Sequence, residues 1–332
     1  MARPKILLVG HAATDIGLGH LSRLLTLTKK LKESKTVHIE LLIFGDPINR
    51  KDFKDLETHL LPFSKSFSNS IKYFINKLRP KVIVFDLHPD KLPKNLEALL
   101  RWLKKKEVVS IGIDSLLDYC EFLDLLWIPS FYVKKNRKSQ YKDKIKYGWD
   151  TFLLQKNLDN QEWKDGKNIL VLTGGSDSTN LGDTLPLKID STIDEGHEVN
   201  WVQGPFSKTP ILPRKPKSRW FVHKDLEQLD ELIIKSNYVL TVFGVSFFEV
   251  LQYGIPTVVY SPYGKKDDIE LKALKKEEVA VVSQDADKAI LDLIELMKDK
   301  AKAKRFSKRA VEKLSTNGSI KFAQEINSFI KT

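Results

Sequence analysis

The stretch PKILLVGHAATDIGLGHLSRLLTLTKKLK, Pro4 to Lys32, sets the pattern that the rest of the chain repeats. Its first part, KILLVG, is a continuous apolar run rich in branched residues, which predicts a buried strand. From Gly19 onward the leucines recur at helical spacing, which predicts a helix with one apolar side. Gly17 and Gly19 stand between the two, and His20 follows directly. The stretch therefore predicts a strand, a turn and a helix that begins beside a histidine.

The same alternation continues on either side of a polar, lysine-rich passage, Tyr132 to Lys167. Apolar runs predict strands before this passage and after it, at 36–45, 81–87, 107–114, 124–130, 168–175, 198–204, 219–222, 237–244, 255–261 and 279–283. Amphipathic runs predict helices between them, among others at 68–79, 96–105, 225–236 and 246–254, and helices fill the remainder of the chain.

This alternation is typical of α/β proteins with parallel sheets covered by helices on both faces. We expect two Rossmann-like domains, at residues 1–150 and 165–332, with the last helices packing back on the N-terminal domain. Open parallel sheets bind ligands at the carboxyl ends of their strands, so two such domains predict a cleft between them. The passage between the domains is where the cleft would hinge.

The composition narrows the class of protein. The net charge is +12, from 55 Lys and Arg against 43 Asp and Glu, and a basic surface attracts nucleotides, nucleic acid or acidic lipid. No RNA-binding aromatic motif, zinc-finger spacing or basic zipper accompanies the charge, so a nucleic-acid partner is not expected. Cys120 is the one cysteine in the sequence, and no run reaches the ~20 apolar residues of a membrane span. We expect a cytoplasmic protein; the charge is compatible with membrane association but does not indicate it.

The loop around Gly17 and Gly19 could hold a phosphate or present His20 to a reacting atom. The dinucleotide fingerprint needs a third glycine, and Ser22 and Arg23 stand near its place. It also needs an acidic residue at the end of the second strand, whereas Glu40 lies inside that strand. A nicotinamide cofactor is therefore not expected. His20 is either a general base or a structural residue that caps the helix or packs against the sheet, and the positive end of the helix favours the neutral imidazole that a base requires.

Two further loops follow predicted strands. In LTGGSDSTN, Gly174 and Gly175 allow a ligand to approach the backbone, and Ser176 and Asp177 offer acceptors or cap a helix. In TVFGVSFFEVLQYGIP, Gly244 turns the chain and Ser246 begins a helix. Amides and a hydroxyl then converge where an anion would bind, with Glu249 one turn further on.

With these motifs in place, the chain resembles the GT-B superfamily. Within it, the chain resembles the nucleotide-sugar hydrolases of pseudaminic acid biosynthesis and the related spore-coat polysaccharide proteins. IGLGHLSRLLTL matches the family signature I-G-x-G-H-x-x-R-x-L-x-L. The segments VIVFDL, GIDSLLDYCEFLDLLWIPS, YGWDTFLL, GGSDSTNL and FGVSFFEVLQYGIPTVV follow in the family's order. The chain departs from the family at His11, where an acidic residue is usual, and at the single glycine of its phosphate turn.

The resemblance implies a division of roles. The C-terminal domain would bind UDP, with Gly244, Val245 and Ser246 at the pyrophosphate, Glu249 at the ribose and backbone near Val222 at the base. The N-terminal domain would hold the sugar, and His20 would activate a water at the anomeric carbon. The remaining substrate-binding residues would be Gly17, Gly19, Gly174, Gly175, Ser176 and Asp177. The resemblance implies neither a cofactor nor a metal.

Three functions remain open from the sequence. The first is hydrolysis of a UDP-sugar, of the UDP-diacetamido-trideoxyhexose type, to free sugar and UDP in the biosynthesis of nonulosonic acids for surface glycans. The second is glycosyl transfer from a UDP-sugar to a glycan or lipid acceptor. The third is nucleotide-sugar binding without catalysis, which the presence of His20 disfavours.

Overall fold

The computed structural model describes residues 3–48, 53–133, 141–224, 226 and 229–331. The chain forms two compact units. We call Met1–Leu154 together with Thr316–Thr332 the N-terminal unit, and Gln155–Ser315 the C-terminal unit. The passage from one to the other falls at Leu154, within the lysine-rich stretch of the sequence, of which positions 134–140 lie outside the described residues.

The N-terminal unit is built on a parallel sheet with the strand order β3-β2-β1-β4-β5-β6-β7. Its strands are β1 (Lys5–Ala12), β2 (His38–Gly45), β3 (Glu57–Leu61), β4 (Val82–Asp86), β5 (Val109–Ile113), β6 (Leu125–Ile128) and β7 (Ile145–Tyr147). Strands β1 and β4 are neighbours, so the loop after β1 and the end of β4 lie at the same edge of the sheet.

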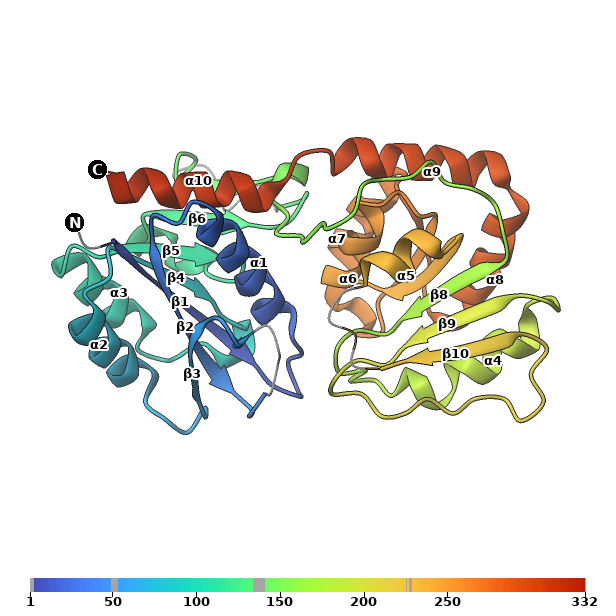
Figure 1. The fold of residues 1–332 in the computed structure, drawn as a ribbon, viewed down its shortest axis with the longest axis horizontal. Coiled ribbons are helices and arrows are strands. Elements are labelled where there is room, and N and C mark those ends of the chain that lie inside the picture. Colours follow the sequence, from blue (N-terminus) through green and yellow to red (C-terminus); the bar gives the residue numbers. More distant parts are fainter. Residues whose placement is uncertain (1–2, 49–52, 134–140, 225, 227–228, 332) are drawn as a thin grey trace. The chain divides into compact units, whose positions relative to one another are not determined.

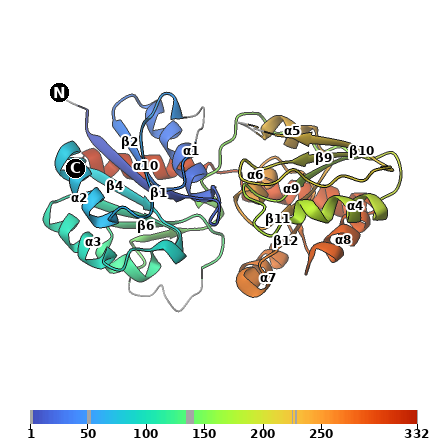
Figure 2. The same cartoon turned by 90° about the horizontal axis from the view of Figure 1, so that it is seen from below.

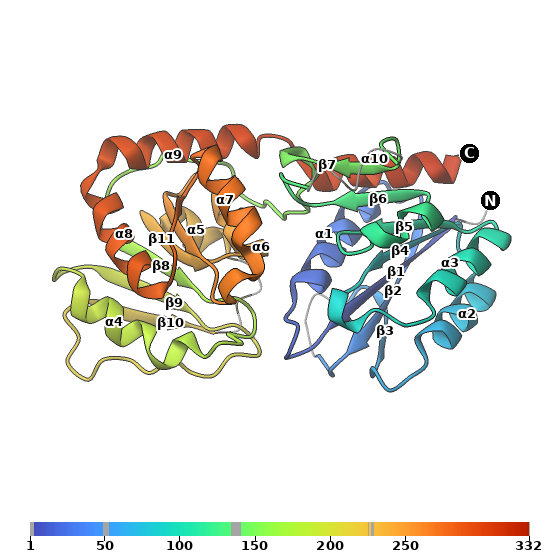
Figure 3. The same cartoon turned by 180° about the vertical axis from the view of Figure 1, so that it is seen from behind.

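Helices cover both faces of this sheet (Figure 1, Figure 3). Helix α1 (Gly19–Glu33) and the C-terminal helix α10 (Gly318–Lys331) lie on one face, and α2 (Phe67–Leu78) and α3 (Leu96–Lys105) lie on the other. Side chains alternate along β1, so Leu7 and Val9 join the core under α2 and α3, while Gly10 faces α1. A Cβ at Gly10 would lie 2.5 Å from Leu24 of α1, so the glycine permits the close packing of that helix.

The chain returns to the N-terminal unit through α10, which lies beside α1 (Figure 1). Gly318 opens the helix against the backbone of 150–152, where a Cβ would come within 2.5 Å of the Phe152 carbonyl oxygen. Phe322 stacks on Trp127 with ring centroids 4.6 Å apart, and Ser319 Oγ donates to the Leu154 carbonyl. Both the apolar face and the helix start of α10 are therefore fitted to this unit.

The C-terminal unit has a second parallel sheet, in the order β10-β9-β8-β11-β12-β13. Its strands are β8 (Asn168–Leu172), β9 (Glu198–Val202), β10 (Arg219–His223), β11 (Tyr238–Val242), β12 (Thr257–Tyr260) and β13 (Val281–Val282). Its helices are α4 (Leu185–Thr192), α5 (Asp230–Lys235), α6 (Val245–Leu251), α7 (Asp268–Glu277), α8 (Ala286–Lys298) and α9 (Lys300–Lys313).

The two faces of the second sheet carry separate cores. Ile169 and Val171 of β8 pack under α4 and α8, whereas Leu170 and Leu172 pack against α5 and α6. Figure 2, seen from below, shows α4 and α8 together and α5 apart from them. Both strand faces are thus buried, which explains why these strands appear in the sequence as continuous apolar runs.

The structure differs from the sequence-based expectation in three places. Strand β3 was not predicted, because its burial is partial and its sequence ETHLL is mostly polar. Strand β7 lies within the lysine-rich passage that we expected to lack strands and helices. Helix α5 covers only Asp230–Lys235 of the helix expected at 225–236, of which positions 225, 227 and 228 lie outside the described residues.

Candidate functional site

The turn before α1 is fixed by its backbone. Gly17 has φ of +76°, a conformation that glycine adopts readily, and its N–H donates to the Ala13 carbonyl at 2.8 Å. The helix then begins at Gly19 with Leu18 at the N-cap position, and no side chain caps it. His20 is therefore not the helix cap, which was one of the roles left open by the sequence.

His20 instead turns toward the end of β4. Its Nδ1 lies 2.6 Å from Oδ1 of Asp86, the last residue of that strand. His20 is 8% exposed and Asp86 is fully buried, so the contact forms away from water. The structure thus pairs a histidine from one loop with a carboxylate from the neighbouring strand.

Arg23, one turn along α1, provides the positive charge that balances the carboxylate of Asp86. Its Nε donates to Asp86 Oδ2 at 2.8 Å and its Nη2 donates to Oδ1 at 2.6 Å, and Nη1 reaches Asp114 Oδ2 at 3.2 Å. Burial alone would raise the pKa of Asp86, but the adjacent Arg23 guanidinium and His20 outweigh it and hold that pKa below its usual range. Burial works against the charged form of Arg23, yet Asp86 and Asp114 raise its pKa. Asp86 and Arg23 are therefore both charged.

This arrangement fixes the proton on the His20 ring. A carboxylate oxygen only accepts hydrogen bonds, so the 2.6 Å contact requires Nδ1–H to donate to Asp86. Arg23 Nη2 also lies 2.9 Å from His20 Nδ1. The two nitrogens are close because both donate to the same acceptor, Asp86 Oδ1. The opposite Nε2 then carries the lone pair, and no partner takes it within the described part of the chain. The neutral form of this ring, held in one tautomer by a buried carboxylate, would have the arrangement of a general base.

His11, the departure from the family pattern, is part of the surrounding structure. It is buried against Phe44 and accepts a hydrogen bond from the His88 backbone N–H at 3.1 Å. Burial, and then the neighbouring His20, lower the pKa of His11 to about 3. His11 is therefore a neutral acceptor that holds the loop after β4, while the ring of His88 meets that of His20 edge-on at 5.6 Å.

In the C-terminal unit, the loop after β8 is shaped by Asp177. Its two carboxylate oxygens accept from the backbone N–H groups of Leu181 at 2.9 Å and Gly182 at 2.8 Å. Gly174 has φ of +88°, and the side chain nearest to its Cβ position is Val242, at 4.0 Å. Asp177 thus orders the loop, and Gly174, Gly175 and Ser176 are partly accessible at its tip.

Two buried polar atoms lie next to this loop without a partner among the described residues. They are Thr173 Oγ1, one residue past β8, and Gln203 Oε1, one residue past β9. An unpaired buried polar atom costs about 1–3 kcal/mol, so such atoms call for an explanation. Both are at the carboxyl edge of the sheet, where open parallel sheets bind their ligands, and a ligand there could supply the missing bonds.

The loop after β11 carries the remaining predicted residues. Gly244, Val245 and Ser246 form the turn into α6, and a Cβ at Gly244 would have open space around it. Glu249 follows one helical turn later. Burial and the nearby Asp230 raise the pKa of Glu249 to about 7, and a hydrogen bond from Ser246 partly offsets them. The carboxylate is therefore held where its charge is costly.

Val222 lies inside β10, which comes first in the sheet order and pairs with β9 in the described residues. The Arg219 N–H donates to His197 and the His223 carbonyl accepts from Gln203, so these residues point their backbone groups toward β9. Alternate residues of a strand point the other way. The N–H and C=O of Val222 thus face the outer edge of the sheet.

The structure therefore brings the predicted residues into two groups. Gly17, Gly19 and His20 lie at the carboxyl edge of the N-terminal sheet. The loops at 174–177 and 244–249 follow the neighbouring strands β8 and β11 at the carboxyl edge of the C-terminal sheet. Sequence reasoning missed Asp86 and the role of Arg23. An aspartate ending a buried strand, VIVFD, was the available signal for Asp86.

Comparison with known proteins identifies the fold. No protein-family model matches the chain. An uncharacterized protein of Methanocaldococcus jannaschii, MJ1062, is 26% identical over an alignment of 283 positions that covers 77% of this chain. The chain spans 55% of that protein's length.

Several solved structures resemble the chain over nearly its whole length. The glycotransferase of kitacinnamycin has a TM-score of 0.68 at 14% identity, covering 99% of this chain and 100% of that one. TcCGT1 in complex with UDP has a TM-score of 0.65 at 11% identity, with 99% and 100% covered. MurG of Acinetobacter baumannii has a TM-score of 0.64 at 12% identity, with 98% and 100% covered. The chain therefore has the GT-B fold, as the sequence predicted.

Proposed function

We propose that the protein is an enzyme that transfers a sugar from a UDP-sugar to an acceptor hydroxyl, with His20 as the general base. The observation that carries this proposal is the His20–Asp86 pair, because its geometry leaves Nε2 able to take a proton. Proteins with the same fold include the glycotransferase of kitacinnamycin. The structure of TcCGT1, which also has this fold, is in complex with UDP.

The chemistry follows from the tautomer. Nε2 of His20 removes the proton of the acceptor hydroxyl while that oxygen attacks the anomeric carbon. The bond between this carbon and the diphosphate oxygen breaks, and UDP leaves with the electron pair. Asp86 keeps Nδ1 protonated and stabilises the imidazolium that forms, and a positioned base of this kind contributes about 10²–10⁴ in rate.

In this proposal the C-terminal unit supplies the contacts to UDP. The orphaned atoms Thr173 Oγ1 and Gln203 Oε1 would provide acceptors at the carboxyl edge of the sheet, and the outward backbone of Val222 would provide a donor and an acceptor at its outer edge. Glu249 would accept from the ribose hydroxyls, which supply the hydrogen bonds that its costly charge lacks. Gly244, Val245 and Ser246 would lie at the pyrophosphate, with Gly174, Gly175 and Ser176 toward the sugar.

Hydrolysis is the second candidate, and the segment Ile16 to Leu27 supports it through its match to the signature of the pseudaminic acid hydrolases. The same base would then remove a proton from water, and the substrate would be a UDP-diacetamido-trideoxyhexose used for surface glycans. The His20–Asp86 pair serves either nucleophile.

A product assay separates these functions. The purified protein is incubated with a panel of UDP-sugars, with and without hydroxyl acceptors, and UDP and sugar products are quantified. UDP release that requires an acceptor supports transfer, and UDP with free sugar in its absence supports hydrolysis. Saturable UDP-sugar binding with no turnover under any condition would leave only a binding function and contradict both enzymatic proposals.

A further inference from the structure

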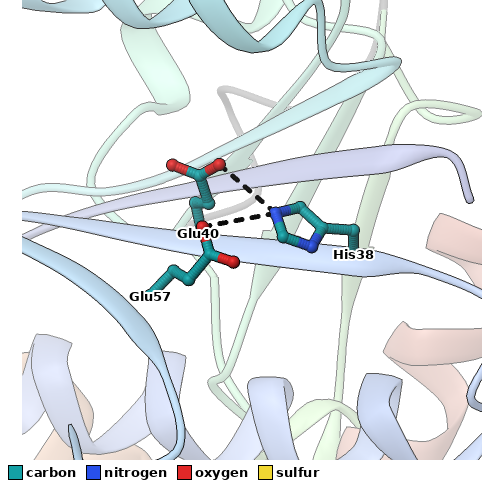
Figure 4. Close-up of side chains that lie close together, drawn as sticks. All are labelled: His38, Glu40 and Glu57. Carbon is teal, nitrogen blue, oxygen red and sulfur yellow. Dashed lines mark hydrogen bonds and ion pairs between the residues drawn. The ribbon is translucent and has the colours of Figure 1, made fainter.

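A second cluster of histidine and carboxylate side chains lies on the N-terminal sheet, at the opposite ends of the strands from His20. It consists of His38 and Glu40 at the start of β2 and Glu57 and His59 at the start of β3. Figure 4 shows Glu40 and Glu57 directed toward one ring nitrogen of His38. None of these residues belongs to the site proposed above.

The strand geometry places all four side chains on one face. His38 and Glu40 are two residues apart, as are Glu57 and His59, so each pair points to the same side of the sheet. The β2–β3 register sets Glu40 opposite Glu57 and Leu42 opposite His59, which aligns the two pairs. This is the face covered by α2, whose Phe74 packs against the His59 ring with centroids 4.6 Å apart.

The separations within the cluster match a metal's coordination shell. His38 Nε2 lies 3.3 Å from Glu40 Oε1 and 3.5 Å from Glu57 Oε2, and the three ligand atoms all lie within 4.8 Å of one another. Ligands at about 2.0–2.1 Å from a tetrahedral Zn²⁺ are about 3.3–3.4 Å apart. The two separations from His38 Nε2 therefore match the edges of such a tetrahedron, and the third lies within 4.8 Å.

The charge balance of the cluster also favours a cation. Glu40 is only 4% exposed, and Glu57 brings a second carboxylate to the same histidine nitrogen. Within the described residues, the ion pairs to Glu40 come from His38 and His59, with no lysine or arginine. When the imidazoles are in the neutral form that binds a metal, the two carboxylates leave two negative charges, which one divalent ion would balance.

We propose that His38 Nε2, Glu40 Oε1 and Glu57 Oε2 bind a divalent transition metal of the Zn²⁺ class, with water in the fourth position. Imidazole and carboxylate together suit this class better than Mg²⁺ or Ca²⁺, which prefer oxygen ligands alone. His59 is a positioning residue, because its Nε2 lies 2.9 Å from the other Glu40 oxygen and can orient the carboxylate. The ion fastens β3, the outermost strand of this sheet, to β2.

Metal titration tests the site without relying on activity. The full chain, stripped with a chelator, is titrated with ZnCl₂ by calorimetry and with CoCl₂ by visible absorption, where tetrahedral Co²⁺ gives strong bands. We expect one Zn²⁺ per chain with micromolar or tighter affinity, a Co²⁺ spectrum of that type, and a rise in the thermal midpoint on adding Zn²⁺.

Three variants and one control locate the ion. Glu57→Gln alters an exposed side chain and should fold normally, and it and His38→Gln should each weaken Zn²⁺ affinity by about 100-fold or more. His59→Gln should weaken affinity by about 10–100-fold while keeping the Co²⁺ spectrum, because it acts through Glu40. His197→Gln in the C-terminal unit is the matched control and should bind as the wild type does. No binding, or wild-type affinity in both Glu57→Gln and His38→Gln, would overturn the proposal.

Discussion

Asp86 in the N-terminal unit is fully buried and Glu249 in the C-terminal unit is partly buried, and the pKa values of these carboxyl groups shift in opposite directions. Burial opposes the charged form of both. At Asp86 the guanidinium of Arg23 and the ring of His20 reverse the effect of burial and lower the pKa. At Glu249 the nearby Asp230 adds to burial, and the pKa rises to about 7. The difference lies in whether the fold itself supplies a positive partner.

The arrangement around Asp86 is therefore complete in the protein alone, whereas in the proposed function a ligand would complete the one around Glu249. The charge of Asp86 is already satisfied by the protein, so it can hold His20 in one tautomer before any substrate arrives. Glu249 receives a hydrogen bond from Ser246 but has no cation beside it among the described residues. In the proposed function, ribose hydroxyls would supply the missing donors. Changes to Asp86 should therefore damage the protein itself, whereas changes to Glu249 should mainly affect binding.

The largest effect is expected for Asp86→Ala. Removing Asp86 leaves the buried Arg23 charged with only the half-exposed Asp114 as its carboxylate partner, and breaking a buried pair in this way typically costs about 3–5 kcal/mol of the free energy of unfolding. The variant should also lose turnover, because His20 loses the acceptor that fixes its tautomer. Urea denaturation and the product assay measure both effects.

Asp114→Ala is the matched control for this change. Asp114 contacts the same Arg23 at 3.2 Å, but its side chain is 45% exposed. An exposed partner of this kind contributes about 0–1 kcal/mol. Similar losses in the free energy of unfolding for the two variants would mean that the buried Asp86 contacts stabilise the protein no more than the exposed Asp114 contact does.

His20→Asn should affect catalysis rather than binding. We expect kcat to fall by about 10²–10⁴-fold, the usual contribution of a general base. The affinity for UDP should stay within about threefold, or ~0.7 kcal/mol, because the proposed UDP contacts come from the C-terminal unit. Calorimetry with UDP and steady-state kinetics separate the two quantities. His88→Asn is the control, since its ring is 5.6 Å from that of His20. Near-normal kcat in His20→Asn would remove His20 from the chemistry.

Glu249→Ala should have the opposite effect to His20→Asn, because it should weaken UDP binding. Losing a hydrogen bond to a charged group should weaken UDP binding by about 1.5–3 kcal/mol, with little loss of folded protein. The exposed Glu231 of α5 provides a control of the same type, and Glu231→Ala should bind UDP normally. Unchanged UDP affinity in Glu249→Ala would exclude this residue from the nucleotide site.

Most of the fold could be predicted from sequence because its strands are buried on both faces. Runs such as KILLVG, VIVFD and NILVL have no polar alternation, and helical leucine spacing follows several of them. Strands β3 and β7 lacked this signal, since β3 is only partly buried and β7 lies among lysines. Their positions depend on pairing with β2 and β6, which local sequence does not encode.

The candidate site could be predicted only where it is local. His20 directly follows a turn that the sequence marks with glycine, and Gly174 and Gly244 stand in such turns, so they were identified. The pairing of His20 with Asp86 joins residues 66 apart in the chain and depends on β1 and β4 being neighbours. The cluster at His38 and Glu57 likewise depends on the β2–β3 register. Sequence spacing indicates which residues share a face, but not which strand lies next to it.

The smallest expected effect is the pH dependence of stability contributed by Glu249. Its pKa is raised from 4.5 to about 7 in the folded protein, so the folded state favours the protonated carboxyl. The stability associated with this group is therefore full below its ordinary pKa and is lost as the pH rises through about 7. Glu249→Gln keeps a neutral side chain at every pH, so its stability does not depend on this ionisation. The free energy of unfolding of the variant relative to the wild type should therefore increase by about 1–2 kcal/mol from about pH 5.5 to about pH 7.5. Urea denaturation at both values measures the difference. Saturating UDP should reduce this difference if the ribose donors stabilise the carboxylate. Parallel pH profiles of stability for the two proteins would instead show that Glu249 ionises as freely as an exposed glutamate.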